Sequence, residues 1–338
     1  MLVPYTPNPG IGAADPALPD GPPANLACVR ELLDNRRYLR GSTWGLLTWS
    51  GLFEVGGSAA TPDVTLGEIE SCVLRRASGK VVAFYAAAVT TSGIAWSSAA
   101  AYVAGDHVVS GGTVWRALGS IAAGGAAPSA GPDWSADLAP DDWYYVYAVS
   151  TGTDAAPGMA YELSQTGPTT SGTFKADGAP TELKRYLGCF PTDSTGKPVP
   201  VLAVRGQYRY RRSAITSVTG AFAANGLRAV PAGGGAVART GLNLAARVPP
   251  HARRAVLFGQ AVVTSTAAGA STALNLYDES DTASVSEEII ANVANNTETS
   301  RNSARAEVQL TSAQVCGYAV VGSGGLYDAT IDLMGWEE

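Results

Sequence analysis

Glycine and proline interrupt this 338-residue chain so often that only short elements fit between them. The chain contains 39 glycines and 20 prolines. One of the two recurs in nearly every stretch of about ten to fifteen residues, which is typical of short strands joined by turns. With 46% apolar residues, the chain is long enough to bury the cores of two or three compact units. The pattern predicts a mostly β protein.

The first forty residues differ from the rest. Residues 1–24 contain seven prolines, which exclude a helix or a central strand and favour an extended arm. Residues 25–40 place apolar side chains near the helical period, with Asn25 as a cap and Gly41 at the expected end. We expect an extended arm followed by one helix. A disordered tail is the alternative for the arm.

Strand patterns occupy residues 41–200, with a break in the middle. Apolar runs predict strands at 44–53, 72–76 and 80–89. An aromatic run resumes the pattern at Trp143, where the side chains of Trp143, Tyr145, Tyr147 and Val149 alternate onto one face. We therefore expect one β domain, interrupted by a small β insert at 95–135.

The insert has an aromatic pattern of its own. Trp96 is followed by Tyr102-Val-Ala-Gly-Asp106, a glycine turn, Trp115-Arg-Ala117, a loop rich in glycine, alanine and proline, and a closing Trp134. This order resembles that of the small chitin- and cellulose-binding modules of bacterial chitinases.

That resemblance implies a role for each marked residue. Tyr102 and Val108 would belong to a small core, Gly105 and Asp106 would form the hairpin turn, and Trp96 and Trp134 would close the module. The implied function is carbohydrate binding.

Sugar binding needs an exposed aromatic face beside hydrogen-bonding groups. In the similar modules the sugar platform follows the aromatic-x-Ala strand, but here that place holds Leu118-Gly-Ser120. Trp115, Tyr102 and Trp134 therefore remain as the candidate carbohydrate-binding residues. A purely structural spacer is the favoured alternative, because a forty-residue module consumes most of its aromatic side chains as core.

Residues 141–200 contain three strand patterns in a distinctive order. They are Trp143-Tyr-Tyr-Val-Tyr147, Tyr161-Glu-Leu-Ser164 and Arg185-Tyr-Leu-Gly-Cys-Phe190, the last followed by the turn Thr192-Asp-Ser-Thr-Gly196. This order resembles the shaft-to-head region of tailed-bacteriophage fibre proteins. The resemblance implies a structural protein of the phage particle.

Residues 201–338 predict a C-terminal antiparallel β-sandwich that forms the head. Strand patterns start at Arg205, Arg254, Ala273, Arg305, Gly317 and Tyr327. In the last of them we expect the core to contain Tyr327, Ala329, Ile331 and Leu333. The residues expected to face solvent are Asp328, Thr330 and Asp332.

Charge is segregated along this domain. Residues 194–277 contain ten basic residues and no Asp or Glu, whereas residues 278–338 contain eleven acidic residues and two arginines. The formal net charge of −6 argues against nucleic acid as a partner. We expect arginines of the first block to pair with carboxylates of the second, within one sandwich or between subunits.

No catalytic or metal-binding motif is present. The two histidines, His107 and His251, accompany neither a Gly-x-Ser-x-Gly elbow nor a zinc-binding helix. Paired carboxylates such as Asp141 and Asp142 occur in any acidic protein, and no β-helix repeat is found. We expect no enzyme activity, no metal and no cofactor.

The chain also lacks the signals of export. It starts without a basic and apolar leader, and no apolar run is long enough to span a bilayer. The four cysteines are Cys28, Cys72, Cys189 and Cys316. Their spacing fits neither a metal site nor a redox motif, so we expect buried, reduced thiols in a chain that folds in a cytoplasm, without membrane insertion.

Taken together, these features predict a homotrimeric phage fibre or tail-tip protein that helps attach the virion to the host surface. Its expected partners are further copies of itself, other virion proteins and a host-surface glycan. The expected virion-attachment residues lie in the arm and helix at Tyr5, Leu26, Val29 and Leu33. The expected location is the virion, assembled in the host cytoplasm.

Two alternatives fit the same sequence features. One is a capsid- or tail-decorating protein without receptor binding, and the other is a bacterial carbohydrate-binding protein. The loops at 225–226 and 322–325 are secondary candidates for surface contacts, because loops at the ends of a sandwich carry variable contacts.

Overall fold

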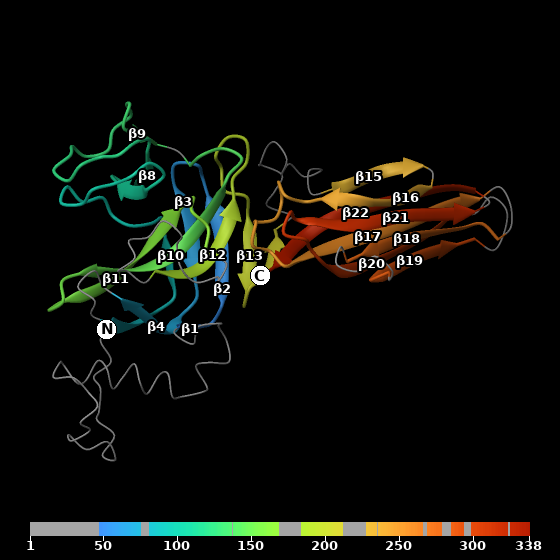
Figure 1. Ribbon diagram of the computed structural model, residues 1–338, viewed down its shortest axis with the longest axis horizontal. Coiled ribbons are helices and arrows are strands. Elements are labelled where there is room, and N and C mark those ends of the chain that lie inside the picture. Colours follow the sequence, from blue (N-terminus) through green and yellow to red (C-terminus); the bar gives the residue numbers. More distant parts are fainter. Residues whose placement is uncertain are drawn as a thin grey trace, which may run out of the picture. The chain divides into compact units, whose positions relative to one another are not determined.

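The computed structural model consists of strands joined by turns and loops (Figure 1). The described residues contain several antiparallel sheets and no helix, which confirms the mostly β prediction. The structure describes residues 47–75, 81–136, 138–168, 184–211, 228–234, 236–265, 269–278, 285–293, 299–323 and 325–338. The expected arm and helix at 1–40 lie outside these residues.

The chain divides into two compact units, Met1–Pro198 and Val199–Glu338. The division lies close to the boundary between residues 200 and 201 that the sequence suggests. The first unit contains a body of three sheets and a smaller fourth sheet, and the second contains two sheets.

The body of the first unit consists of strands on either side of the insert. Strands pair in the orders β2-β3-β6, β1-β4-β5 and β11-β10-β12. Their bounds are β1 (Leu47–Trp49), β2 (Leu52–Gly57), β3 (Pro62–Leu66), β4 (Ile69–Arg75), β5 (Val81–Ala86), β6 (Val89–Thr91), β10 (Trp143–Gly152), β11 (Pro157–Ser164) and β12 (Arg185–Pro191). Contacts of β10 with β4, β11 with β5 and β12 with β2 pack the third sheet on the other two.

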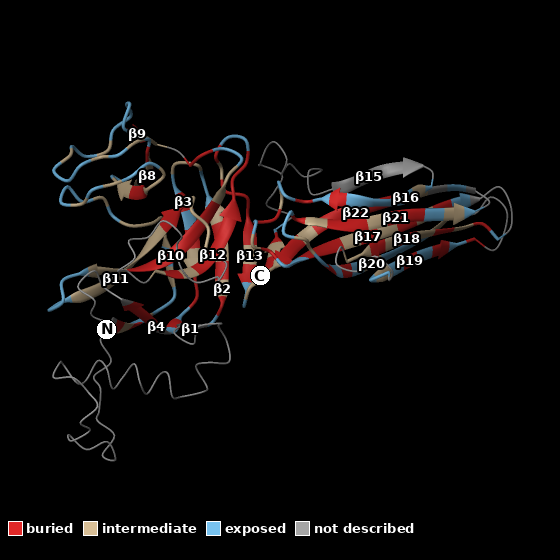
Figure 2. Ribbon diagram, in the orientation of Figure 1, coloured by how far each residue is buried: buried red, intermediate tan, exposed pale blue. Residues whose placement is uncertain are grey.

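Strand β10 is buried on both faces, which a one-sided alternation does not predict. Tyr144, Val146 and Ala148 are fully buried, but Tyr145 and Tyr147 on the opposite face are also nearly inaccessible. Figure 2 shows buried residues along β10 and β12. Elements outside the sheet cover β10: β4 contacts it, and His107 of the insert packs on Tyr144. The strand pattern is therefore correct, but its assignment to a single apolar face is incomplete.

A buried carboxylate holds the turn after β12. The Oδ1 atom of Asp193 accepts hydrogen bonds from the Thr195 amide at 2.8 Å, the Thr195 hydroxyl at 2.7 Å and the Lys197 amide at 3.0 Å. Asp193 is fully buried, and Gly196 takes a positive φ of 79°. This network explains why the turn needs an aspartate and a glycine at these positions.

The insert forms its own sheet between β6 and β10. Its strands are β7 (His107–Ser110), β8 (Thr113–Ala117) and β9 (Trp134–Ser135), in the order β7-β8-β9. Gly111 and Gly112 make the hairpin turn, with φ values of 61° and 80° that suit a tight primed turn. The expectation that Gly105 and Asp106 form the hairpin is wrong. They form the turn that leads into β7, closed by the Asp106 amide donating to the Val103 carbonyl at 3.0 Å.

The second unit is built from two stacked antiparallel sheets. One has the order β20-β17-β22-β14-β13, with β15 also paired to β22, and the other has the order β16-β21-β18-β19. Their bounds are β13 (Val201–Val204), β14 (Gln207–Tyr210), β15 (Arg228–Gly234), β16 (Val237–Asn243), β17 (Arg254–Ser265), β18 (Ser271–Tyr277), β19 (Glu287–Asn292), β20 (Thr299–Gln309), β21 (Val315–Ser323) and β22 (Gly325–Glu337).

The two sheets are in close contact at Gly259 on β17. A Cβ atom at this glycine would lie 2.5 Å from Ile289 Cδ1 and 2.9 Å from Leu274 Cδ2. Leu274, Ile289 and Leu257 are all fully buried or nearly so. Their burial places the core of this unit between the two sheets.

Two sequence expectations for this unit need correction. The alternating segment at Arg205 is a hairpin rather than one strand, because Arg205 and Gly206 turn with φ values of 53° and 79°. Thr330 and Asp332 are buried, although the alternation of β22 predicts that they face solvent. Strand β22 is flanked on both sides, and residues of β17 lie beside both positions in register.

The last strand closes the sheet with an aromatic stack. Trp336 is fully buried and stacks on Tyr208 at a centroid distance of 4.5 Å with an interplanar angle of 8°. At the preceding position, a Cβ atom on Gly335 would lie 1.9 Å from the Tyr208 carbonyl oxygen. Glycine is therefore needed where β22 pairs with β14.

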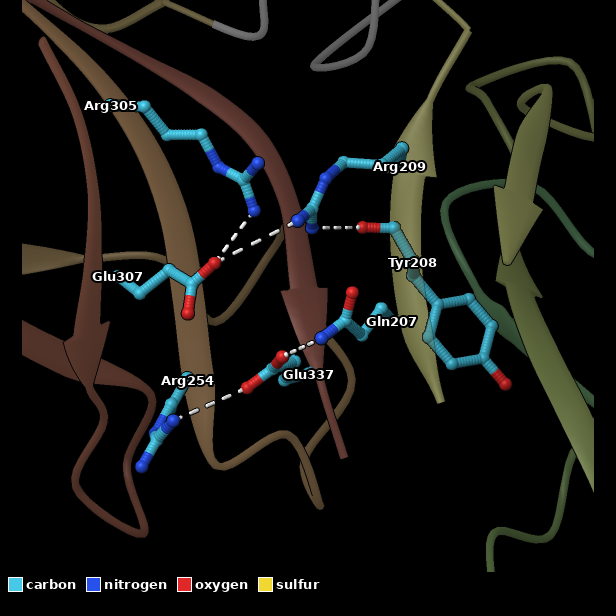
Figure 3. A network of polar contacts seen from close by, with 7 residues as sticks. All are labelled: Gln207, Tyr208, Arg209, Arg254, Arg305, Glu307 and Glu337. Atoms are coloured by element: carbon cyan, nitrogen blue, oxygen red, sulfur yellow. Dashed lines mark hydrogen bonds and ion pairs between the residues drawn. The ribbon is translucent and has the colours of Figure 1, made fainter. Parts of the chain in front are cut away.

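The two charge blocks meet within the second unit. Arg209 lies 3.9 Å from Glu307 and Arg254 lies 3.5 Å from Glu337. Figure 3 shows Arg209 directed at Glu307, which Arg305 also contacts at 2.6 Å. These pairs confirm that arginines of the basic block reach carboxylates of the acidic block. They are partly exposed, so each contributes no more than about 1 kcal/mol to stability.

Candidate functional site

The aromatic residues of the insert gather on one face of its small sheet. Val108, Ala117 and Trp134 are buried there. The partly buried residues that pack against them are Ile94, Trp96, Tyr102, Trp115 and Ile121. The predicted core positions of Tyr102 and Val108 and the closing positions of Trp96 and Trp134 agree with this arrangement.

Two of the three candidate sugar-binding residues contact each other in this core. Tyr102 and Trp134 meet edge to face at a centroid distance of 5.5 Å and an interplanar angle of 66°. The Tyr102 hydroxyl accepts a hydrogen bond from the Ser97 amide and donates one to the Ser97 carbonyl, at 2.8 and 2.9 Å. Trp134 is only 5% exposed. The pair does not present a flat open face.

Trp115 lies on the same face but is only half-buried. It is paired in register with Val108, and its indole N–H donates to the Ser110 carbonyl at 3.3 Å. Trp115 and Tyr102 are both partly buried, so neither presents a fully exposed ring. Trp134 is the candidate that the core encloses.

The opposite face of the insert sheet packs on the body. His107 is buried against the Tyr144 ring, with centroids 4.9 Å apart and planes 85° apart. The Val114 amide donates to the Ala60 carbonyl at 2.8 Å, and Asp106 forms a β-bridge with Ser164 at the end of β11. The insert is thus docked on the sheet that contains β10 and β11.

A pocket lies along this junction. Its volume is about 350 Å³, and it is lined by Ala104, Gly105, Arg116, Ala117, Leu118, Gln165 and Thr166. Arg116 is the charged member of this lining, and Leu118 is 44% exposed at its edge. The lining thus combines small and polar residues around one charged side chain.

Arg116 is held in place by its strand. It lies on the central strand β8, paired in register with His107 on one side and Ser135 on the other. Its Nε atom is buried and has no hydrogen-bond partner among the described residues. The guanidinium is always charged at ordinary pH, so a partly buried arginine favours an anion beside it.

Gln165 is oriented by a hydrogen bond on the body side. Its Nε2 donates to the Asp142 Oδ2, while the other carboxylate oxygen of Asp142 accepts from the Trp143 amide at 2.7 Å. Because the amide nitrogen is engaged, the Gln165 carbonyl oxygen turns toward Gly105, where it lies 3.5 Å from the position that a Cβ would occupy.

Tyr144, behind this site, remains a neutral phenol. Burial raises the pKa of Tyr144, and Asp142 adds to the rise. The hydrogen bond from the Ala139 amide and the charge of Arg116 oppose it. The Tyr144 hydroxyl accepts the Ala139 amide at 2.6 Å. A neutral phenol with its oxygen so engaged serves packing rather than proton transfer.

Sequence reasoning missed Arg116 and Gln165. Arg116 is the middle residue of the Trp115-Arg-Ala117 strand, and Gln165 follows a strand about fifty residues later in the chain. Only their tertiary contact forms the pocket. The sequence signal for this pocket was weak. It consisted of one charged side chain, Arg116, on the face of β8 opposite to Trp115.

The other candidate residues lie elsewhere or outside the described part of the chain. Tyr5, Leu26, Val29 and Leu33 belong to residues 1–46, which the structure does not describe. The loop at 225–226 also falls outside the described residues. Of the candidate loop at 322–325, residues 322–323 end β21 and residue 325 begins β22, while residue 324 lies outside the described residues.

The described cysteines match the expected thiols. Cys72, Cys189 and Cys316 are buried and form no disulfide. Cys28 lies outside the described residues.

Comparisons of the sequence with protein-family models and with curated proteins found no relative. No protein-family model matches the chain, and no curated protein matches its sequence. Among the described residues, the structure contains no helix that is long and apolar enough to cross a membrane.

Proposed function

We propose that this chain is a structural protein of a tailed-phage particle. In this proposal it forms a homotrimeric fibre or tail-tip protein that contacts the host surface. The expected segments 143–147, 161–164 and 185–190 lie in three adjacent strands of one sheet, β10, β11 and β12. That shared sheet is the observation that carries the proposal. The turn at Asp193 then ends the first unit.

The docked insert supports a role at a surface. A module that resembles carbohydrate-binding modules packs on the body through His107 and Val114, so it is held in a fixed orientation. Fixed orientation reduces the entropy lost when a surface ligand binds. In this proposal the insert and its pocket face a host glycan, and the two-sheet second unit is a β-sandwich head.

The edges of the sheets are the reason to expect a trimer. Among the described residues, strands such as β16 and β20 lie at the ends of their sheets, and proteins cover or charge such edges. Three copies around one axis would cover such edges. The arm and helix at 1–40 would attach the trimer to other virion proteins, and the fibre would carry out no catalytic step.

Two other functions use the same chain differently. A decorating protein of the capsid or tail would occupy the particle without touching the host. A bacterial carbohydrate-binding protein would bind glycans without any particle. The docked insert favours the attachment role over decoration, because a decoration has no need for an oriented pocket.

An adsorption experiment tests the proposal. Host bacteria would be incubated with the purified full-length chain before phage particles from a strain that carries this sequence are added. We expect the chain to reduce adsorption of these particles in proportion to its concentration. A chain found on the particle that never blocks adsorption would indicate decoration, and a chain that is absent from the particle would overturn the phage proposal.

A further inference from the structure

The pocket at the insert–body junction combines one cation with neutral hydrogen-bonding groups. Arg116 supplies the positive charge from a strand that is paired on both sides. Gln165 supplies an oriented amide oxygen, and Thr166 lines the wall beside it. This set is suited to an anionic group attached to a hydroxyl-rich body.

The position of Arg116 separates it from the aromatic core of the insert. Trp115 and Arg116 are neighbours on β8, so their side chains leave the sheet on opposite faces. Trp115 packs with the aromatic core, whereas Arg116 lines the pocket with body residues. The pocket is therefore a different place from the aromatic face that the sequence predicts for sugar.

The environment of Arg116 leaves it suited to a partner from outside. Its Nε is buried without a hydrogen-bond partner among the described residues. The carboxylate of Asp142, on the body side, is engaged by Gln165 and by the Trp143 amide. The guanidinium charge of Arg116 lines the pocket, and an anion that enters the pocket would compensate this charge.

We propose that this pocket binds the carboxylate-bearing sugar unit of an acidic host-surface polysaccharide, an inference that rests on the proposed attachment function. A guanidinium forms a planar fork that matches a carboxylate in two parallel hydrogen bonds. The ring hydroxyls of the sugar meet the Gln165 oxygen and Thr166, and Leu118 contacts the apolar ring face. A volume of about 350 Å³ accommodates one sugar ring.

Binding of simple probes to the full-length chain tests the ligand class. Galacturonate, galactose and glycerol phosphate would be compared by titration calorimetry or saturation-transfer NMR at low and high salt. We expect galacturonate to bind about tenfold or more tightly than galactose, and to weaken in salt. Equal binding of the acidic and neutral sugars would overturn the proposal. Tighter binding of glycerol phosphate would assign the pocket to phosphate polymers instead.

Variants at the pocket test the location. Arg116→Gln removes the charge and is expected to abolish the preference for galacturonate. The exposed edge residue Leu118 gives two further variants that leave the core intact, since its side chain is 44% exposed. Leu118→Asp should weaken galacturonate binding and Leu118→Lys should strengthen it. Leu326→Asp, at a residue 77% exposed in the second unit, is the matched control and should bind as the parent does.

The two proposals fail in distinguishable ways. If the parent chain blocks phage adsorption and Arg116→Gln blocks it equally, the pocket proposal is wrong while the attachment function stands. If galacturonate binds through Arg116 but the chain is absent from particles, the phage assignment is wrong and the pocket remains an acidic-sugar site. Unchanged galacturonate binding in both Leu118 variants would also contradict the proposed location.

Discussion

At the scale of single residues, buried polar groups fix the turns of the first unit. The Asp193 carboxylate is fully buried and one of its oxygens accepts three hydrogen bonds from Thr195 and Lys197. Replacing Asp193 with alanine leaves these donors without their acceptor. We expect a loss of about 3 kcal/mol of unfolding free energy, measured by denaturant titration.

Two further variants define the cause of that loss. Asp193→Asn keeps an acceptor oxygen but removes the charge, so we expect a smaller loss. Val103 is 54% exposed in the same unit, and Val103→Ala should change stability by no more than about 0.5 kcal/mol. Equal stability of the alanine and parent proteins would show that the network does not hold the turn.

A second residue-scale prediction concerns pH. Burial raises the pKa of the Cys72 thiol from 9.0 to about 12, with the charge of Arg185 opposing the rise. Between these two pH values the Cys72 thiol therefore keeps its proton in the folded state, whereas in the unfolded chain the thiol loses it. The stability that this thiol contributes is complete below pH 9.0 and is lost as pH rises toward 12.

The size of this effect can be measured against a variant. Between about pH 8 and about pH 10, Cys72 should account for a fall of about 1.4 kcal/mol in unfolding free energy. Cys72→Ala is expected to be less stable at every pH because of the cavity, but to show a shallower decline in this range. Parallel pH curves for the two proteins would contradict the burial of a neutral thiol.

At the scale of elements, the end of β22 anchors the second unit. Trp336 stacks on Tyr208 within the core, while Glu337 contacts Gln207 at 2.6 Å and Arg254 at 3.5 Å (Figure 3). Deleting residues 335–338 should cost at least about 3 kcal/mol, because a fully buried tryptophan is lost.

The polar contacts of the same segment serve as the control. Glu337→Gln combined with Glu338→Gln removes the charges that face Arg254 and His251 and keeps the tryptophan. We expect a change of no more than about 1 kcal/mol, measured by thermal unfolding. A larger loss in the double variant than in the deletion would show that charge rather than packing holds the strand.

The elements also show what the sequence could predict. Strands with long apolar or aromatic runs, such as β10 and β17, were predictable because alternation and turns mark them. Strands β3, β15, β16 and β19 were missed, since their glycines, prolines or charged residues hide the alternation. The hairpin at Arg205 was missed because a non-glycine residue takes a positive φ there.

The candidate site was predictable only in part. The order of aromatic residues identified the insert and the members of its core. It could not separate buried rings from partly buried ones, because Trp134 differs from Tyr102 and Trp115 only through tertiary packing. The Arg116 pocket arises from segments that are distant in sequence, so no local pattern reveals it.

At the scale of the whole molecule, the account predicts an oligomer. Size-exclusion chromatography with light scattering should give three times the 34.6 kDa mass of the chain. The physical reason is that three copies would cover strand edges that a single copy exposes. A stable monomer across the micromolar range would contradict the trimer, although a decorating protein could still be monomeric.

The central claim is that the chain is a host-facing part of a phage particle. The most direct measurement is a cryo-electron microscopy reconstruction of intact particles from a strain that carries this sequence, with the chain located in the density. We predict three copies around one axis at the tail tip or in a fibre, with the insert exposed to the outside. Particles that lack the chain, or that carry it only on the capsid surface, would contradict the claim.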